Sequence, residues 1–561
     1  MTPDCGLLRT FCVKCTKSCT EDIVLLFHHL HAPLRRSSLS IFIGCVLVAW
    51  CAPVSANINW TLIGPDGGTV DKIIINPNNS NILFSLSYMG GVHRSTNAGA
   101  SWIRITSNLP LTDGTDYCRF NDIAIDPITP SILYVATNNG LYRTSDAGAT
   151  WDFPFPPSTD LVAVSPVTPD TIYCSHFDCL HKSVDGGDTW NIVYQATDHN
   201  DIEKISLDPN WPDVVYIHDT QSVLKSTDGG ASWTSIFLTP DGMAPGIAID
   251  PRDSSVVYLI YLAKFHASVD GGETWTQRAT LYSAADAISL DPQNPDTIYV
   301  GYRNAPYLAV SVDAGFSWHN ISIEGWEGNI HDVDVDPDDS QVVYLAGFSG
   351  VYKSPDGGAS WQISNRGLNN LLAYDLVVNP KNPQNIFMLA EYNQLYRSLD
   401  SGATWDKVGT DSVFKYYWPI CLEIDPVNPD VLYAGCVGGG LLSSADGGQN
   451  WTMLRSSAGS SDVLRICVHP KNTSIIVFSI SPGSNFLRTT DGGAHWTSIN
   501  NGELVNIHDV ALDPDDPMTI YAAIATGLYK TTDGGGSWNK VLNTSSCYSV
   551  AVDPISPANV Y

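Results

Sequence analysis

One short motif recurs eleven times along the chain and constrains its fold more than any other feature. The motif is Ser/Thr-x-Asp-x-Gly-x-x-Trp, and its tryptophans run from Trp102 to Trp538 at a mean spacing of about 44 residues. A regular repeat of this size is typical of solenoids and propellers. The first copy has Asn97 at the aspartate position. The other ten copies carry Asp146, Asp185, Asp228, Asp270, Asp313, Asp356, Asp400, Asp446, Asp491 and Asp533.

Each repeat also contains phrases typical of β-strands. In 288–300, alternating apolar residues precede an Asp-Pro turn, and an Ile-Tyr-Val run follows it. A second phrase, such as Gly-Leu-Tyr-Arg-Thr-Ser at 140–145, leads into the motif, and the motif tryptophan opens a fourth stretch. Short alternating or continuous apolar runs between turn residues indicate strands. We therefore predict an all-β β-propeller built from about twelve four-stranded blades.

The number of repeats leaves two arrangements open. Eleven motifs are followed by a further strand phrase at 550–561. We favour two propellers of six or seven blades within 57–561, and the alternative is one large ring. The strand-like segment 59–63 is expected to close the last blade. Because the chain ends inside a strand phrase and an unpaired edge is a liability, we expect the natural C-terminus to lie further on.

The first 56 residues resemble a secretory signal with an extended basic region. Arg35 and Arg36 precede the uncharged apolar stretch 39–54, and small residues end at Ala56. This order is typical of a cleaved export signal. The predicted localisation is therefore secreted, periplasmic or cell-surface, with membrane attachment only if the signal stays uncleaved. Seven cysteines follow Ala56, too few for a disulfide scaffold in a chain of this length.

Composition narrows the class of partner. The formal net charge is −29, from 29 basic and 58 acidic side chains. A chain this acidic repels phosphate backbones, so nucleic-acid binding is excluded. No metal or cofactor is predicted. The expected partner is a protein or a glycan on the loop face, the end of the propeller where each blade's fourth strand connects to the next blade's first strand.

The repeated motif is interpreted as a folding element. Its Asp carboxylate and Ser/Thr hydroxyl can hydrogen-bond to turn amides. Its Gly permits a positive φ, and its Trp buries a large apolar face. Catalysis needs one site and not eleven, so we assign the motif aspartates a structural role.

On these motifs the chain resembles the BNR/Asp-box superfamily of β-propellers, and the repeats cover nearly all of 57–561. That superfamily includes sialidases, xyloglucan-cleaving glucanases and the sortilin-type receptor domain, so the resemblance implies the fold and leaves the activity open. The Arg-Ile-Pro segment of sialidases does not occur here. The xyloglucanase-like family has a catalytic Asp in its first blade, and Tyr88 occupies that position in the matching stretch 87–94.

We therefore predict a non-catalytic binding propeller, similar in part to sortilin, and leave enzyme activity uncertain. The alternative is a glycoside hydrolase, a xyloglucanase-like endo-glucanase with a diverged acid pair. In that case the acids would be loop carboxylates such as Asp113, Asp116, Glu324, Glu327 and Asp411. No catalytic residue is assigned.

Candidate ligand-binding residues come from the loop face. Aromatic residues there could stack on sugars or pack between blades, and both interpretations stay open. The phrase Asn-Ile-His-Asp-Val occurs at 329–333 and again at 506–510. Its His-Asp pair could supply a general base or cap the first strand. The candidates are Trp326, His331, Asp332, Tyr416, Tyr417, Trp418, His508 and Asp509.

Overall fold

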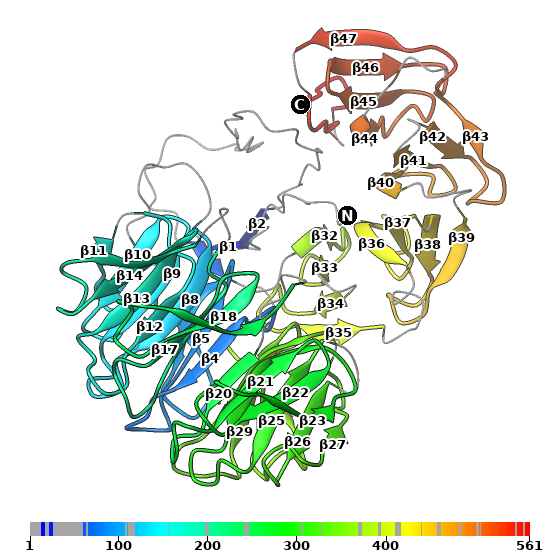
Figure 1. Ribbon diagram of the computed structural model, residues 1–561. Helices are drawn as coiled ribbons and strands as arrows, with labels where there is room; N and C mark the ends of the chain where they lie inside the picture. The colour runs from blue at the N-terminus through cyan, green and yellow to red at the C-terminus, as the bar shows by residue number, and fades with distance from the viewer. Residues whose placement is uncertain are drawn as a thin grey trace. The chain divides into compact units, whose positions relative to one another are not determined.

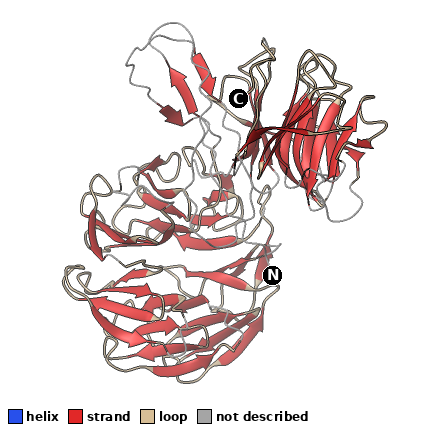
Figure 2. Cartoon of the chain, turned by 90° about the horizontal axis from the view of Figure 1, so that it is seen from above, coloured by secondary structure: helices blue, strands red, loops and turns tan. Residues whose placement is uncertain are grey.

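The computed structural model describes residues 13–16, 22–25, 60–62 and 66–561. Short gaps within the last range lie at 107–108, 110–117, 156, 197–200, 241–245, 304–306, 327, 369–372, 391–393, 410–416, 439, 457–461, 482–484, 501–503, 505–506, 545–546 and 554–555. These described residues form eleven four-stranded sheets and one three-stranded sheet, and no helix is found among them (Figure 2). Consequently no helix of the described part is long and apolar enough to cross a membrane. The predicted all-β propeller is confirmed.

The chain divides into two compact units, one of residues 66–370 and one of residues 1–65 with 371–561. We number the four-stranded sheets as blades in chain order. The first unit contains blades 1 to 7, coloured blue to green in Figure 1. Their strands are β4 (Lys72–Ile75), β5 (Leu83–Ser87), β6 (Gly91–Ser95), β7 (Ile103–Arg104); β8 (Phe120–Ile125), β9 (Leu133–Thr137), β10 (Gly140–Thr144), β11 (Asp152–Phe155); β12 (Val162–Val164), β13 (Ile172–His176), β14 (Cys179–Ser183), β15 (Asn191–Gln195); β16 (Lys204–Leu207), β17 (Val215–His218), β18 (Ser222–Ser226), β19 (Thr234–Leu238); β20 (Gly246–Ile249), β21 (Val257–Tyr261), β22 (Lys264–Ser268), β23 (Thr276–Thr280); β24 (Ala285–Leu290), β25 (Ile298–Tyr302), β26 (Leu308–Ser311), β27 (His319–Ile321); β28 (Ile330–Val335), β29 (Val343–Gly347), β30 (Gly350–Ser354) and β31 (Gln362–Ile363).

The other unit contains blades 8 to 11. Their strands are β32 (Ala373–Val378), β33 (Ile386–Ala390), β34 (Gln394–Ser398), β35 (Asp406–Val408); β36 (Trp418–Ile424), β37 (Leu432–Val437), β38 (Gly440–Ser444), β39 (Thr452–Arg455); β40 (Asp462–Val468), β41 (Ile476–Ser481), β42 (Asn485–Thr489), β43 (Thr497–Ser498); β44 (Ile507–Leu512), β45 (Ile520–Ile524), β46 (Gly527–Thr531) and β47 (Asn539–Asn543). The three-stranded sheet consists of β1 (Val13–Thr16), β2 (Asp22–Leu25) and β3 (Trp60–Leu62).

Strand β3 corrects one expectation. The segment 59–63 was expected to close the last blade, but β3 pairs with β1, with Trp60 opposite Cys15 and Leu62 opposite Val13. The expected cleavage site after Ala56 lies outside the described residues. Each of the seven cysteines from Cys118 to Cys547 is a free thiol.

Within every blade, four strands follow one another as antiparallel hairpins. The second strand is the most buried: in blade 7, all five residues of β29 are buried, whereas both residues of β31 are exposed. The first strand is the inner one, because inner strands of successive blades pack against each other, as β24 does against β28. Apolar residues from two neighbouring blades therefore share one core, as Tyr299 of blade 6 does with Val343 of blade 7.

Blades 1 to 7 close on themselves. Inner strand β28 of blade 7 packs against β4 of blade 1. The Gly67 N–H donates to the Leu368 carbonyl at 2.6 Å, and the Trp102 N–H donates to the Arg366 carbonyl at 2.8 Å. We call this unit the seven-bladed ring. Its closure favours two propellers over one large ring.

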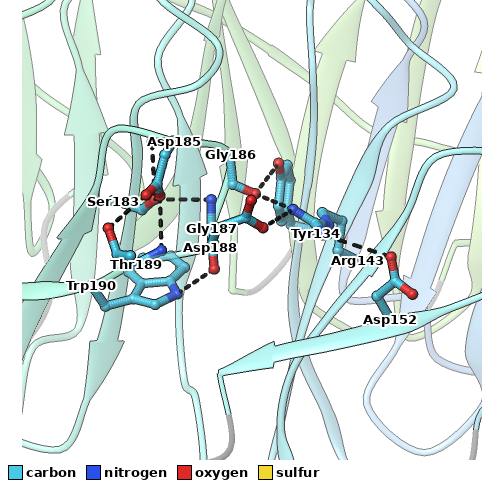
Figure 3. A network of polar contacts seen from close by, with 10 residues as sticks. All are labelled: Tyr134, Arg143, Asp152, Ser183, Asp185, Gly186, Gly187, Asp188, Thr189 and Trp190. Atoms are coloured by element: carbon cyan, nitrogen blue, oxygen red, sulfur yellow. Dashed lines mark hydrogen bonds and ion pairs between the residues drawn. The ribbon is translucent and has the colours of Figure 1, made fainter.

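Each motif forms a compact turn, shown for blade 3 in Figure 3. Ser183 Oγ donates to Asp185 Oδ1 at 2.7 Å, and the Gly187 N–H donates to Ser183 Oγ at 2.9 Å. Thr189 donates to the same carboxylate through its N–H and its hydroxyl, at 2.8 and 2.6 Å. These donors, the Thr189 hydroxyl foremost, lower the pKa of Asp185 to about 2. The carboxylate is therefore held by donors of its own turn.

The turn is also held by the preceding blade. Tyr134 Oη and Arg143 Nη1 of blade 2 both donate to the Gly186 carbonyl, at 3.0 and 2.7 Å (Figure 3). Equivalent Tyr and Lys side chains of blade 7, Tyr344 and Lys353, donate to the Ala98 carbonyl in blade 1. We call this arrangement the interblade clamp. It explains why a Tyr and a Lys or Arg recur in the strand phrases of the repeat.

Candidate functional site

A pocket of about 530 Å³ lies along the inner strands of the seven-bladed ring. Its walls come from the first strands of blades 1, 2, 3, 4 and 7, with most of its charge at one end. The polar lining residues are Asp71, Lys72, Asn121, Asp122, Glu203, Lys204, His331 and Asp332. Two of the predicted ligand-binding residues, His331 and Asp332, thus lie in one pocket with carboxylates far away in sequence.

Asp332 links blade 7 to blade 1. A β-bulge at His331 shifts the register of β28 against β29. Asp332 Oδ1 accepts the N–H of Val333 at 3.1 Å, and its Oδ2 accepts the N–H of Ile73 on β4 at 3.0 Å. The carboxylate therefore satisfies backbone donors of two inner strands, which supports the strand-capping interpretation of the His-Asp phrase.

The second copy of the phrase has the same arrangement. Asp509 Oδ1 accepts the N–H of Val510 at 2.9 Å, and its Oδ2 accepts the N–H of Val550 at 3.0 Å. His508 hydrogen-bonds to the Cys547 carbonyl at 3.0 Å and stacks on Tyr548, and burial lowers its pKa. A neutral, backbone-bonded imidazole is typical of a structural residue, which agrees with the strand-capping interpretation, and a ligand role for His508 and Asp509 stays a prediction.

The ionisable groups in the pocket and next to it shift one another's pKa. Lys72 Nζ donates to Asp122 Oδ1 at 2.7 Å. Burial opposes the charged form of Lys72, but the charges of Asp122, Asp332 and Asp334 together raise its pKa. Burial raises the pKa of Asp332, and burial together with the Asp332 charge raises the pKa of Asp334 to about 8. Asp334 is therefore largely protonated at neutral pH, while it accepts the Ile75 N–H at 3.1 Å.

Asp71 and Glu203 are partly exposed carboxylates at equivalent places in blades 1 and 4. Each stands directly before an inner strand, and its N–H donates to the second strand, at 2.8 Å for Asp71 and 2.9 Å for Glu203. Each faces a histidine: Asp71 Oδ1 lies 3.2 Å from His331 Nδ1, and Glu203 Oε2 lies 3.4 Å from His218 Nδ1. Burial and the nearby Asp201 raise the pKa of Glu203.

Sequence reasoning missed both carboxylates, although a signal exists. The strings Asp71-Lys72-Ile73 and Glu203-Lys204-Ile205 repeat an acid-Lys-Ile pattern at the start of an inner strand. Of the loop acids named above, only Glu324 lies in the described part of the chain. Glu324 is exposed on a turn before β28, and Asp113, Asp116, Glu327 and Asp411 lie outside the described residues.

The predicted aromatic residues divide into buried and exposed ones. For Trp326 the structure agrees with packing between blades: it is 4% exposed and packs on Tyr352 in the core between blades 6 and 7. Tyr417 packs against the core of blades 8 and 9, whereas Trp418 is 65% exposed at the start of β36. Tyr416 lies outside the described residues. No group of three or more His, Cys, Asp or Glu side chains in the described part could hold a metal ion.

Comparisons with known proteins match parts of the chain. The model of the family "Sortilin, neurotensin receptor 3" matches residues 439–559. A xyloglucanase of Hypocrea jecorina is 29% identical over 125 residues, which are 20% of this chain and 14% of that protein. A xyloglucanase of a Paenibacillus species is 32% identical over 103 residues, which are 16% of this chain and 9% of that protein. The matched regions are thus a small part of these relatives' length.

Solved structures match most of the chain. A GH74 xyloglucanase from Xanthomonas campestris has a TM-score of 0.54 at 15% identity and covers 88% of this chain and 89% of its own. A GH74 enzyme from Niastella koreensis has a TM-score of 0.52 at 19% identity and covers 87% of each chain. These structures share the fold of this chain. The curated relatives are xyloglucanases, which agrees with the alternative expectation of a glycoside hydrolase-like propeller better than with a non-catalytic binding module. The repeated motif, the four-stranded blades and these partial matches indicate a β-propeller of the BNR/Asp-box type.

Proposed function

We propose that the chain is an exported glycoside hydrolase-like propeller that binds a neutral glucan and cleaves it at the pocket of the seven-bladed ring. The observation that carries the proposal is that Asp71 and Glu203, each beside a histidine, line the same pocket. The similarity to xyloglucanases supports the substrate class. A net charge of −29 disfavours anionic polysaccharides.

Glycoside hydrolysis usually needs one carboxylic acid to protonate the leaving oxygen and one carboxylate to assist attack on the sugar. Glu203 suits the acid, because burial and Asp201 raise its pKa and keep it protonated further toward neutral pH. Asp71 suits the carboxylate, because it accepts the Tyr88 N–H at 2.6 Å and lies 3.2 Å from the His331 ring.

One observation favours a second candidate, a glucan-binding propeller without hydrolysis. Tyr88 stands where the xyloglucanase-like family has a catalytic Asp, and a phenol cannot replace a carboxylate in an acid pair. Asp71 accepts a hydrogen bond from the backbone of Tyr88, so a carboxylate still lies beside the place of the family's catalytic Asp.

The test is release of reducing ends from soluble xyloglucan by the purified chain. Asp71→Asn and Glu203→Gln should each lower the rate by a factor of about 100 or more, since each removes one proton-transfer group. Asp253→Asn is the control, because Asp253 lies on the turn between the first and second strands of blade 5, at the opposite end of the ring. Binding of xyloglucan without any release would establish the second candidate, and absence of both would overturn the proposal.

A further inference from the structure

Two exposed aromatic side chains occupy the same place in blades 1 and 3. Tyr88 follows β5 and is 42% exposed, and Phe177 follows β13 and is 58% exposed. Both stand first in the turn between the second and third strands. Antiparallel topology places these turns at the loop face, the end at which Asp71 and Glu203 enter the inner strands.

Both turns are anchored by the same pair of backbone hydrogen bonds. The Tyr88 N–H donates to Asp71 Oδ2 at 2.6 Å, and its carbonyl accepts the Phe120 N–H of blade 2 at 2.8 Å. The Phe177 N–H donates to Asp160 Oδ2 at 3.4 Å, and its carbonyl accepts the Ile202 N–H that precedes blade 4 at 3.2 Å. The backbone of each aromatic residue is thus bonded to a carboxylate of its own blade.

Phe177 adopts an unfavourable backbone for its size. Its φ is +49°, a left-handed conformation in which a bulky residue is an outlier. Stability alone would favour Gly or Asn in this two-residue turn and would favour a polar side chain on an exposed position. The same turn position of blade 5 carries Leu262 at φ +56°, so what distinguishes Phe177 is its exposed ring, which a ligand can contact.

A fixed aromatic face beside a carboxylate suits a sugar ring. The apolar C–H face of a pyranose can stack on the aromatic ring, and the carboxylate accepts hydrogen bonds from sugar hydroxyls. Asp71 and Asp160 carry negative charge into this surface, so a neutral sugar fits better than an anionic one. Blade 2 lies between blades 1 and 3 and contributes Arg119, whose guanidinium lies 5.8 Å from the centre of the Tyr88 ring.

We propose that Tyr88 with Asp71, and Phe177 with Asp160, form two sugar subsites for a neutral polysaccharide that lies across blade 2 on the loop face of the seven-bladed ring. A whole blade separates the two pairs, so only an extended oligomer can contact both. The proposal rests on the proposed function for its ligand class, and it adds that the chain binds internal segments of a polymer.

The experiment measures the affinity of the full chain for soluble xyloglucan by affinity electrophoresis in the cold, with Tyr88→Ala, Phe177→Ala and Phe177→Gly. Each variant should weaken binding about tenfold, as expected for an exposed aromatic anchor. Phe177→Gly should also melt at a higher temperature than the parent, because it relieves the positive φ. A loss of affinity together with a gain in thermal stability would separate ligand contact from damage to the fold.

Trp211→Ala is the matched control. Trp211 is 63% exposed on the turn between the first and second strands of blade 4, at the opposite end of the ring, and its replacement should leave affinity unchanged. If the parent binds xyloglucan and the three variants bind equally well, the subsites are overturned while the proposed function stands. If Trp211→Ala weakens binding instead, the ligand lies on the other end. If the parent does not bind, both proposals fail.

Discussion

The motif turns and the closing seam of the seven-bladed ring use aspartate in opposite ways. Asp185 accepts three hydrogen bonds on an exposed turn and has a pKa lowered to about 2. Asp334 accepts two backbone hydrogen bonds on buried strand β28 and has a pKa raised to about 8. Both carboxylates accept hydrogen bonds, so the opposite directions of their pKa shifts must come from another cause. At Asp334 that cause is burial together with the charge of Asp332. The number of hydrogen bonds alone therefore does not predict the charge state of an aspartate in this fold.

The largest expected effect concerns Asp334→Asn and pH. Because the folded chain holds a proton on Asp334 that the unfolded chain releases, the free energy of unfolding of the parent should fall, relative to the variant, as pH rises from about 4 to about 8. Urea unfolding at several pH values measures this. Asp185→Asn should behave oppositely: the lowered pKa of Asp185 stabilises the fold above about pH 4, and this contribution is lost as pH falls toward about 2. If the free energy of unfolding changed with pH in the same way for the parent and Asp334→Asn, the raised pKa of Asp334 would be contradicted.

A smaller effect on stability distinguishes the serine hydroxyl of one motif from its aspartate carboxylate. Ser226 is buried, donates to Asp228 at 2.8 Å and accepts the Gly230 N–H at 2.8 Å. Ser226→Ala leaves a buried donor unpaired and should lower the free energy of unfolding by about 1–3 kcal/mol. Asp228→Ala removes an exposed carboxylate and should lower the melting temperature by less. Both variants should bind xyloglucan like the parent, and loss of binding at an unchanged melting temperature would show that this motif has a ligand role.

The smallest effect is a gain. Ala147 adopts φ +56° at the motif position where several other copies have Gly. Ala147→Gly relieves this left-handed conformation, but it also increases the freedom of the unfolded chain, so we expect a net gain of up to about 1 kcal/mol. Thermal melting measures it, and Ala149→Gly, two residues further along the same motif, is the control that should not stabilise. A melting temperature lowered by Ala147→Gly would show that the turn does not strain Ala147.

Features whose partners lie close in sequence could be predicted. The Ser183–Asp185–Thr189 turn closes within seven residues, so its chemistry is visible in the motif itself. The pairing of Asp71 with His331 depends on closure of the ring across 260 positions, and no local pattern encodes it. The sequence left open whether Trp326 contacts a ligand or packs between blades, and contact with Tyr352 buries it. Burial of a loop side chain is decided by the neighbouring blade, which the sequence does not identify.

The interblade clamp has a consequence for how the ring is made. The tyrosine contacts of the clamps within the ring join residues 52 to 58 positions apart, such as Tyr134 with Gly186 and Tyr299 with Gly357, so each can form soon after the next repeat leaves the ribosome. The last clamp joins Tyr344 to Ala98 across 246 positions. Closing the longer loop costs about 1 kcal/mol more in chain entropy. Vectorial synthesis would therefore build an open row of blades, and closure would come as a separate, final step.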